Sequence, residues 1–163
     1  MELRETLLGM LERDSRLLPE DLAERLGLQI EEVASELGAM VDEQVICGYH
    51  TLINWDKTKR EFVTALIEVK VSPQHGMGFD KIARRIYLFD EVKAVYLMSG
   101  GFDLTVIVEG DNIKDIAYFI SDKLAPMESV LSTATHFVLK KYKDHGIVIE
   151  RQKKPDERMI VSP

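Results

Sequence analysis

The spacing of apolar residues changes at Phe62, and this change constrains the fold more than any other feature of the chain. Before it, apolar side chains recur at helical spacing. From Phe62 onward, the stretch FVTALIEVKVS (62–72) places them at every second position, which is the period of a β-strand. The chain is therefore predicted to join a helical N-terminal part to a part that contains a sheet.

The part after Phe62 runs strand, helix, strand, strand, helix, strand. Its helices are expected at 78–89 and from an N-cap at Asp111 or Asn112, and its last strand at 128–143. A glycine pair between the two middle strands predicts a hairpin. This order is typical of the ferredoxin-like βαββαβ arrangement, in which two helices cover one face of a four-stranded sheet. The predicted buried helix positions are Phe79, Ile82, Ala83, Ile86, Ile113, Ile116, Ala117 and Ile120.

The face of this sheet opposite the helices is also expected to carry apolar side chains. Apolar residues on both faces of a sheet that helices cover on one side imply a second layer, most simply another copy of the chain. An oligomer is therefore expected. The residues assigned to this second face are Leu66, Ile107, Leu131, Phe137 and Leu139.

The first fifty residues have the pattern of a helix-turn-helix. A second helix starts at Pro19 and ends at Gly27, a third helix follows, and VICGYHTLIN (45–54) is predicted to be a strand. The predicted buried positions of the three helices are Leu3, Leu7, Leu8, Leu11, Leu22, Ala23, Leu26, Ile30, Val33, Ala34, Leu37 and Val41.

The predicted class is thus α+β, a winged helix-turn-helix followed by a ferredoxin-like domain. We expect the winged helix-turn-helix at 1–50, a linker strand at 51–61, a ferredoxin-like ligand-sensing and oligomerisation domain at 62–143 and a C-terminal tail at 144–163. The tail is expected to be either a loose terminus or a strand added to a neighbouring subunit.

The negative charge of the chain is concentrated in its first fifty residues. That segment holds four bases and twelve acids, a balance of −8, against −7 for the whole chain, so the remainder carries +1. The expected solvent face of the third helix is acidic, and DNA affinity comes largely from Lys and Arg that neutralise phosphates. Little non-specific DNA binding is therefore expected. The residues of this face are Glu31, Glu32, Ser35, Glu36, Ala39, Asp42 and Glu43.

Several classes of function find no support in the sequence. The longest apolar runs are far shorter than the ~20 residues that cross a bilayer, and no secretion signal is visible. A single cysteine, Cys47, fits a reducing cytoplasm and is expected to be packed. Four scattered histidines (His50, His75, His136 and His145) suggest no metal site, and no nucleophile–base pair stands out. We expect a cytoplasmic protein that is not an enzyme and has no cofactor, metal or membrane contact.

Three segments resemble one known family. VICGYHTLIN (45–54) is similar to the segment that leaves the helix-turn-helix in Lrp/AsnC regulators, the leucine-responsive feast/famine group. SGGFDLTVIVEG (99–110) resembles the Gly–Asp hairpin of that family, and VLSTATHFVLKKYK (130–143) resembles its last strand. The resemblance spans about residues 2–143. It implies a transcription regulator that binds duplex DNA, forms homodimers and assembles further, to a tetramer or octamer.

The same resemblance implies an amino-acid-like effector bound between dimers at Ser99, Gly100, Gly101, Phe102 and Asp103. Glycines let backbone N–H groups approach a carboxylate, and an aspartate pairs with an ammonium group. The family commonly has threonine where this chain has Ser99. A plainer alternative stays open, in which the glycines only form a turn that Asp103 caps.

For DNA, the resemblance makes the third helix the recognition helix. The residues expected to contact DNA are Arg25, Gln29, Ser35, Lys57, Lys59 and Arg60. The family usually carries bases or serines where this helix is acidic. The alternative is a small-molecule sensor or scaffold that does not bind DNA and whose acidic N-terminal unit binds a protein. The sequence leaves open the effector, the operator, the sign of regulation and the size of the assembly.

Overall fold

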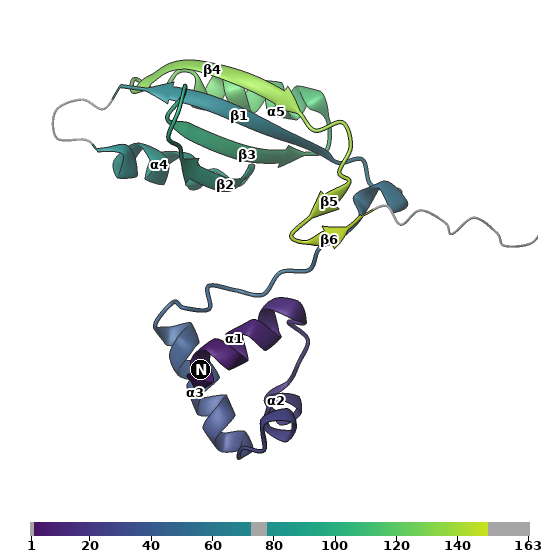
Figure 1. The fold of residues 1–163 in the computed structure, drawn as a ribbon. Helices are drawn as coiled ribbons and strands as arrows, with labels where there is room; N and C mark the ends of the chain where they lie inside the picture. Colours follow the sequence, from purple (N-terminus) through teal and green to yellow (C-terminus); the bar gives the residue numbers. More distant parts are fainter. Residues whose placement is uncertain (1, 73–77, 150–163) are drawn as a thin grey trace, which may run out of the picture. The chain divides into compact units, whose positions relative to one another are not determined.

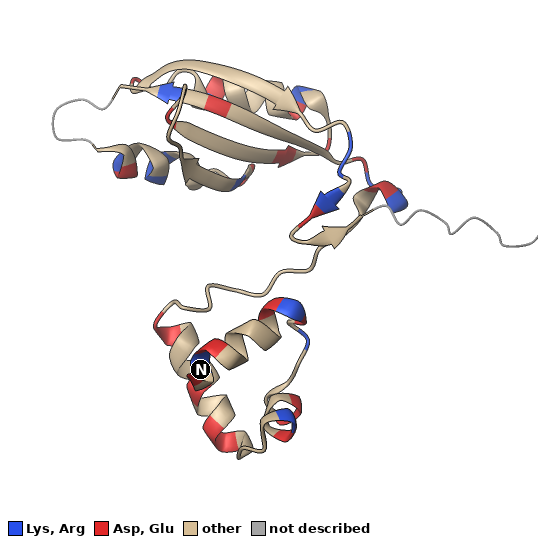
Figure 2. Ribbon diagram, in the orientation of Figure 1, with Lys and Arg blue, Asp and Glu red and all other residues tan. Residues whose placement is uncertain are grey.

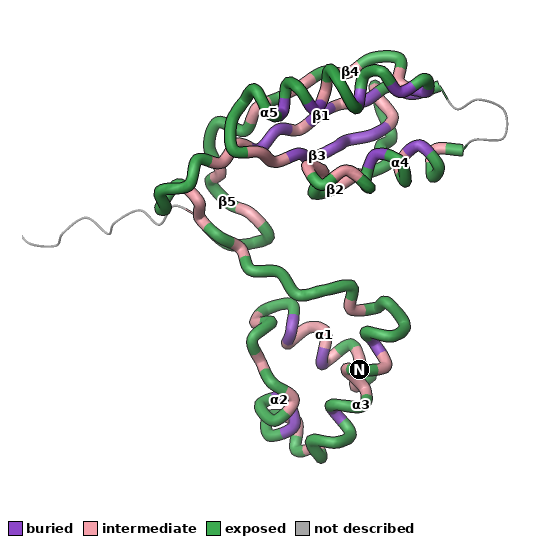
Figure 3. The backbone as a smooth tube through the Cα atoms, turned by 180° about the vertical axis from the view of Figure 1, so that it is seen from behind, coloured by how far each residue is buried: buried purple, intermediate pink, exposed green. Residues whose placement is uncertain are grey.

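The computed structural model describes residues 2–72 and 78–149, and the chain divides into two compact units, Met1–Leu52 and Ile53–Pro163 (Figure 1). The first unit contains helices only, and the second contains the four-stranded sheet with its helices. Each unit has its own cluster of buried apolar side chains. Figure 3 shows buried residues in both units.

The N-terminal unit consists of α1 (Leu3–Arg13), α2 (Pro19–Leu26) and α3 (Ile30–Asp42). Proline at the first position of α2 suits a helix start, and the Asp21 carboxylate accepts a hydrogen bond from the Leu18 N–H at 2.9 Å. Gly27 ends α2 with a φ of 68°, a left-handed conformation that glycine adopts without steric cost. The predicted helix-turn-helix is confirmed.

The buried face of α3 differs from the predicted one. Val33 is buried as expected, but Ile30, Ala34 and Val41 are exposed, and the buried partner of Val33 is Met40. A unit of three short helices covers only a narrow stripe of each helix, and Val33 and Met40 lie two turns apart on that stripe. The buried cluster is Leu7, Leu11, Leu22, Ala23, Val33 and Met40.

The strand predicted at 45–54 is not formed, and neither is the linker strand expected at 51–61. Between α3 and the first strand of the sheet, the described chain contains only a short 3-10 helix, Trp55–Lys57. A strand needs a neighbour for its N–H and C=O groups, and no described segment pairs with this one. The expectation that Cys47 is packed is also wrong, because Cys47 is exposed.

The C-terminal unit has the predicted βαββαβ order, which confirms the ferredoxin-like arrangement. Its sheet has the strand order β2-β3-β1-β4, and every neighbouring pair is antiparallel. The α5 helix continues directly into a π-helical segment, Phe119–Leu124. The elements are β1 (Val63–Val71), α4 (Phe79–Tyr87), β2 (Val92–Leu97), β3 (Leu104–Gly110), α5 (Ile113–Tyr118) and β4 (Val130–Phe137).

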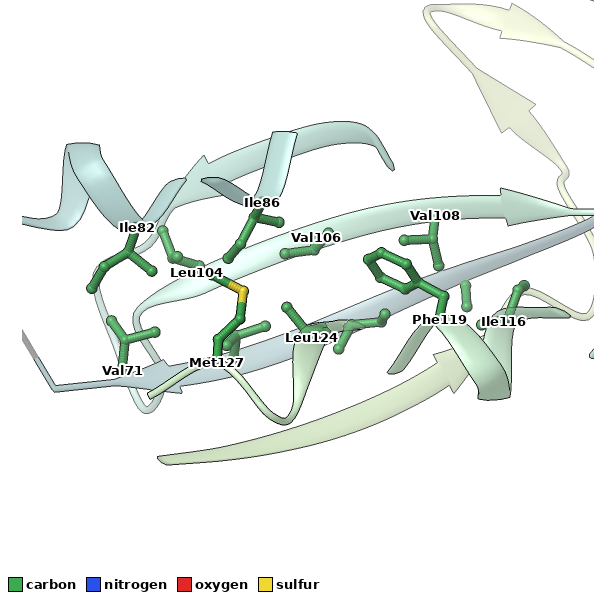
Figure 4. Packing of buried hydrophobic residues seen from close by; sticks show 13 residues of the cluster. Val71, Ile82, Ile86, Leu104, Val106, Val108, Ile116, Phe119, Leu124 and Met127 are labelled. Atoms are coloured by element: carbon green, nitrogen blue, oxygen red, sulfur yellow. The ribbon is translucent and has the colours of Figure 1, made fainter. Parts of the chain in front are cut away.

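The two helices cover one face of the sheet, and the core lies between them and the strands (Figure 4). Alternate residues of β1 and β3 point toward the helices, as the two-residue period requires. Ile67 and Val106 are paired across these strands and fully buried. Ile82 and Ile86 of α4 and the Phe119 ring complete the cluster, as predicted for the α4 positions.

The start of α5 is as predicted and its buried stripe is not. The Asn112 side chain caps the helix by accepting a hydrogen bond from the Asp115 N–H at 3.0 Å. Ile116 is buried, but Ile113 is 56% exposed and Ala117 is exposed. Ile113 lies in the first turn of α5, and the buried residues of this helix and of the π-helical segment that continues it are Ile116, Phe119 and Leu124.

No helix or strand of the described residues, 2–72 and 78–149, covers the opposite face of the sheet. Leu66 and Ile107, which are paired across β1 and β3, lie on it as predicted. The placement of Phe137 there is wrong, because Phe137 pairs with Ala65 and packs against the core on the helix side. Strand β4 has one extra residue opposite Lys70 and Val71 of β1, where the register of the two strands shifts. An extra residue reverses the face of every residue on one side of it, and this reversal explains the error.

The last predicted strand, 128–143, is too long. Strand β4 ends at Phe137, and Leu139 beyond it is 95% exposed. A separate two-stranded hairpin follows, formed by β5 (Lys143–Asp144) and β6 (Ile147–Val148), with Gly146 at a φ of 78° in its turn. This hairpin occupies the beginning of the tail expected at 144–163, and residues 150–163 lie outside the described part of the chain.

Replacing Phe119 tests the packing of the C-terminal core. Phe119→Ala should lower the free energy of unfolding of this unit by about 3–5 kcal/mol, because it removes a buried ring and leaves a cavity. Its neighbour Tyr118 is 63% exposed, so Tyr118→Ala should change stability by less than about 1 kcal/mol. Urea denaturation followed by circular dichroism measures both, and equal losses would contradict this description of the core.

Candidate functional site

The predicted effector residues come together in the loop between β2 and β3. Ser99, Gly100 and Gly101 are exposed, and Gly100 has a φ of 149° that disfavours other residues. No heavy atom lies within 4 Å of the place that a Cβ on Gly101 would occupy. The backbone of Gly101 is therefore open to approach.

Asp103 ties this loop to the central strand. Its carboxylate accepts a hydrogen bond from the Val71 N–H at 2.8 Å, and its own N–H donates to the Val69 carbonyl at 3.1 Å. Its carbonyl accepts from the Met98 N–H at 2.8 Å. These contacts give Asp103 a structural role against β1, and the alternative in which it caps the glycine turn stays a prediction. The ligand role stays a prediction, and it rests on the carboxylate oxygen Oδ1, which does not take part in the Val71 contact.

In the N-terminal unit, Arg4 pairs with Glu36 of α3 and with Glu43, the C-cap residue of that helix. Its guanidinium donates from Nε to the Glu36 carboxylate and from Nη1 and Nη2 to the two Glu43 oxygens, at 2.5 and 3.1 Å. These contacts lower the pKa of Glu43 and raise the pKa of Arg4. Figure 2 shows the acidic residues along α1–α3. Part of the acidic surface of α3 is thus neutralised within the unit.

A second arginine of this unit is also paired. Arg16 donates to both carboxylate oxygens of Asp14 at 2.8 Å, and the backbone N–H of Arg16 adds a third bond at 3.1 Å. Hydrogen bonds from Arg16 lower the pKa of Asp14 to about 2.

The predicted DNA-contacting residues are all exposed, but they belong to both units. Arg25 lies in the last turn of α2, Gln29 at the N-cap of α3 and Ser35 within α3. Lys57, Lys59 and Arg60 belong to the second unit. The Arg60 guanidinium lies 4.9 Å from the centre of the Trp55 ring.

Other kinds of site find little basis in the described chain. Within residues 2–72 and 78–149, no group of three or more His, Cys, Asp or Glu side chains has the geometry of a metal site. Of the histidines considered as ligands, His75 lies outside these residues. No helix in the same ranges is long and apolar enough to span a membrane.

Comparison with known proteins identifies the family. Residues 64–148 match the Lrp/AsnC ligand binding domain. The chain is 46% identical over 158 residues to YugG of Bacillus subtilis (strain 168), an uncharacterized HTH-type transcriptional regulator, and the match covers 96% of this chain and 95% of that protein. The chain belongs to the Lrp/AsnC family of transcriptional regulators. The resemblance of the hairpin and of the last strand is thereby confirmed.

Two solved structures share the fold. Escherichia coli AsnC is 19% identical, with a TM-score of 0.63 and coverage of 91% of this chain and 93% of that one. A Neisseria meningitidis transcriptional regulator, solved as a complex with L-Met, is 21% identical, with a TM-score of 0.66 and coverage of 83% and 86%. At these identities the likeness concerns the fold, which it confirms.

The role of Arg4 was missed in the sequence. Arg4 lies 32 residues from Glu36 and 39 from Glu43, so no pattern of local spacing connects them. The only feature of the sequence that could have indicated this role is the position of Arg4, a basic residue near the start of a strongly acidic unit. A base in such a unit is expected to find carboxylate partners, but only the packing of α1 against α3 decides which ones.

The Arg4 contacts predict a pH dependence. Because the pKa of Glu43 is lowered from 4.5 in the folded unit, its pairing stabilises the fold above pH 4.5 and is lost as the pH falls through the folded value. Arg4→Gln should therefore speed amide hydrogen exchange in α1 and α3 at pH 7, and this effect should shrink as the pH is lowered below 4.5, after correction for intrinsic exchange rates. Arg13→Gln on the same helix is the control, and an equal effect from it would contradict the specific role of Arg4.

Proposed function

We propose that this regulator binds duplex DNA through α2 and α3 and changes its assembly when an amino acid binds to the loop Ser99–Asp103. The observation that carries the proposal is the 46% sequence identity with an HTH-type transcriptional regulator over 96% of this chain. The exposed N-terminal part of α3 supports it, because this part of a recognition helix contacts base edges.

In the proposed complex, Gln29 and Ser35 donate or accept hydrogen bonds at base edges or phosphates, and Arg25 contacts a phosphate. Lys57, Lys59 and Arg60 supply further phosphate contacts from the segment before β1. Glu31, Glu32 and Asp42 remain exposed on α3 and repel the backbone. Affinity therefore has to come from several half-sites bound at once.

Self-association through the uncovered face of the sheet would supply those half-sites. Leu66, Ile107 and the 55%-exposed Tyr96 offer apolar area there, and the Glu68 carboxylate lies 3.2 Å from the His136 ring nitrogen. A second copy that covers this face would make a homodimer, and dimers would assemble further to a tetramer or octamer.

The effector proposal rests on the open glycine loop and on the family domain that contains it. Binding of L-Met by the Neisseria meningitidis regulator supports an amino acid as the ligand class. An amino-acid carboxylate would accept hydrogen bonds from the backbone of Gly100 and Gly101, and its ammonium group would approach Asp103. The ligand then shifts assembly by its different affinity for two arrangements.

One observation favours a second candidate function. The first fifty residues carry a balance of −8, and a strongly acidic helix surface repels DNA. In this alternative, the chain senses a small molecule and its N-terminal unit binds a basic surface of another protein. Both candidates are non-enzymatic and place the protein in the cytoplasm, which stays a prediction from the sequence.

Selection of duplexes from fragmented genomic DNA at low salt tests the DNA proposal. We expect enrichment of a two-fold symmetric site. Ser35→Ala or Gln29→Ala should then weaken binding to that site about 5- to 100-fold if the residue contacts a base, and Arg25→Gln should reduce the salt slope by about one. Ser15→Ala, in the exposed turn after α1, is the control. A folded oligomer that enriches no sequence at any salt would favour the protein-binding alternative.

Substitution of Gly101 tests the effector loop. Gly101 has open space around it, so Gly101→Leu should fold normally and obstruct the backbone N–H groups of the loop. Calorimetric titration with each of the common amino acids should find a ligand for the unmodified oligomer that Gly101→Leu binds about tenfold or more weakly. Gly78→Leu, at the N-cap of α4, should keep that affinity. Equal affinity in both variants would exclude the loop as the binding site.

A further inference from the structure

The C-terminal unit contains a groove that is separate from the Ser99–Asp103 loop. The groove has a volume of about 950 Å³, within the ~300–1,000 Å³ of typical small-molecule sites. It is formed by the segment before β1 and by the residues that follow β3. Its lining includes Trp55, Arg60, Phe62, Asp111 and Ile113.

The groove offers apolar surface that the fold itself does not use. The Trp55 and Phe62 rings lie 5.6 Å apart, tilted by 33°, and both are only partly buried. Ile113 is 56% exposed on the other wall, although its position in the helical pattern predicted burial. An apolar ligand group between these side chains would remove their surface from water.

Arg60 and Asp111 place opposite charges side by side at this apolar surface. The Arg60 guanidinium lies 4.9 Å from the Trp55 ring centre and 5.5 Å from that of Phe62, which orients its planar fork. One of its nitrogens lies 3.4 Å from the Asp111 carboxylate, and the two side chains are 54% and 71% exposed. So long and exposed a contact contributes little by itself, and both groups retain hydrogen-bonding capacity.

The charges of the lining favour a zwitterion over a simple ion. Three bases (Lys59, Arg60 and Lys114) are balanced by three acids (Asp56, Glu61 and Asp111). A ligand with only a carboxylate would satisfy Arg60 but lie against the Asp111 carboxylate. An α-amino acid carries its carboxylate and ammonium on one carbon, which matches the adjacent Arg60 and Asp111 side chains.

We propose that this groove binds an α-amino acid with an aromatic or large aliphatic side chain. Its carboxylate pairs with Arg60, its ammonium group pairs with Asp111, and its side chain lies against Trp55, Phe62 and Ile113.

This site does not rest on the proposed effector loop. The loop precedes β3 and the groove follows it, so the two sites are ~20 Å apart, the length of a seven-residue strand. An occupied groove would also withdraw Arg60 from DNA phosphates.

The single tryptophan of the chain gives this site its own signal, because Trp55 lines the groove. Trp55 emission from the full-length oligomer, excited where phenylalanine does not absorb, is titrated with L-phenylalanine and L-leucine. We expect a saturable change with at least one of them. 3-Phenylpropanoate, which lacks the ammonium group, and phenethylamine, which lacks the carboxylate, should bind about tenfold or more weakly than L-phenylalanine or not at all.

Variants assign the binding to the groove. Arg60→Gln and Asp111→Asn should each weaken binding about tenfold or more, measured by calorimetry because Arg60→Gln also alters the surroundings of Trp55. Arg84→Gln and Asp80→Asn, exposed positions on α4, are the matched controls. Gly101→Leu should leave the Trp55 response unchanged, which separates this site from the loop. No response to either amino acid, or equal affinity in Arg60→Gln and Arg84→Gln, would overturn the proposal.

Discussion

The C-terminal unit depends on the pairing of β1 with β3 on one side and with β4 on the other. This register aligns Ile67 with Val106 and with Thr135, so alternate residues of all three strands turn toward the helices. A shift by one residue would move the apolar set to the wrong face. The same register leaves Leu66 and Ile107 uncovered, and it joins the loop before β3 to the end of β1 through Asp103. Core, association surface and candidate effector loop therefore share one constraint.

In the N-terminal unit, the fold favours DNA binding and the negative charge opposes it. Arg4 offsets part of that charge. A helix-turn-helix suits a DNA groove, yet its third helix is rich in carboxylates. Glu36 of this helix and its C-cap residue Glu43 are held by Arg4 from α1. Arg4 therefore offsets part of the negative charge of this surface locally, within a unit whose overall balance stays at −8. In the C-terminal unit, the groove at Trp55 places charged side chains beside an apolar surface, in the segment that leads into β1.

The parts that the sequence predicted correctly depend on local period and on end signals. The helices, the βαββαβ order, the glycine hairpin and the Asn112 cap all follow from spacing within a few residues. The errors have another origin. Phe137 was assigned to the wrong face because a register irregularity in β4 reverses a two-residue period. Ile113 was expected to be buried from its helical spacing, but it lies in the first turn of α5 and is exposed. The prediction of a strand at 45–54 was wrong because an alternating pattern does not show whether a neighbouring strand is present, and no described segment pairs with these residues.

The candidate sites show the same difference between features formed by neighbouring residues and contacts between distant ones. The loop Ser99–Asp103 was proposed from its resemblance to a family hairpin, whose glycines and aspartate are neighbours in the chain. The contact of Asp103 with Val71, the pairing of Arg4 with α3 and the approach of Arg60 to Asp111 join residues 32 or more positions apart. Apolar period and turn residues act over a few residues, so the printed letters were enough to specify the three N-terminal helices and the βαββαβ order of the second unit. Which charges are neutralised, and which side chains share a groove, depends on packing between distant segments, and only the folded chain decided that.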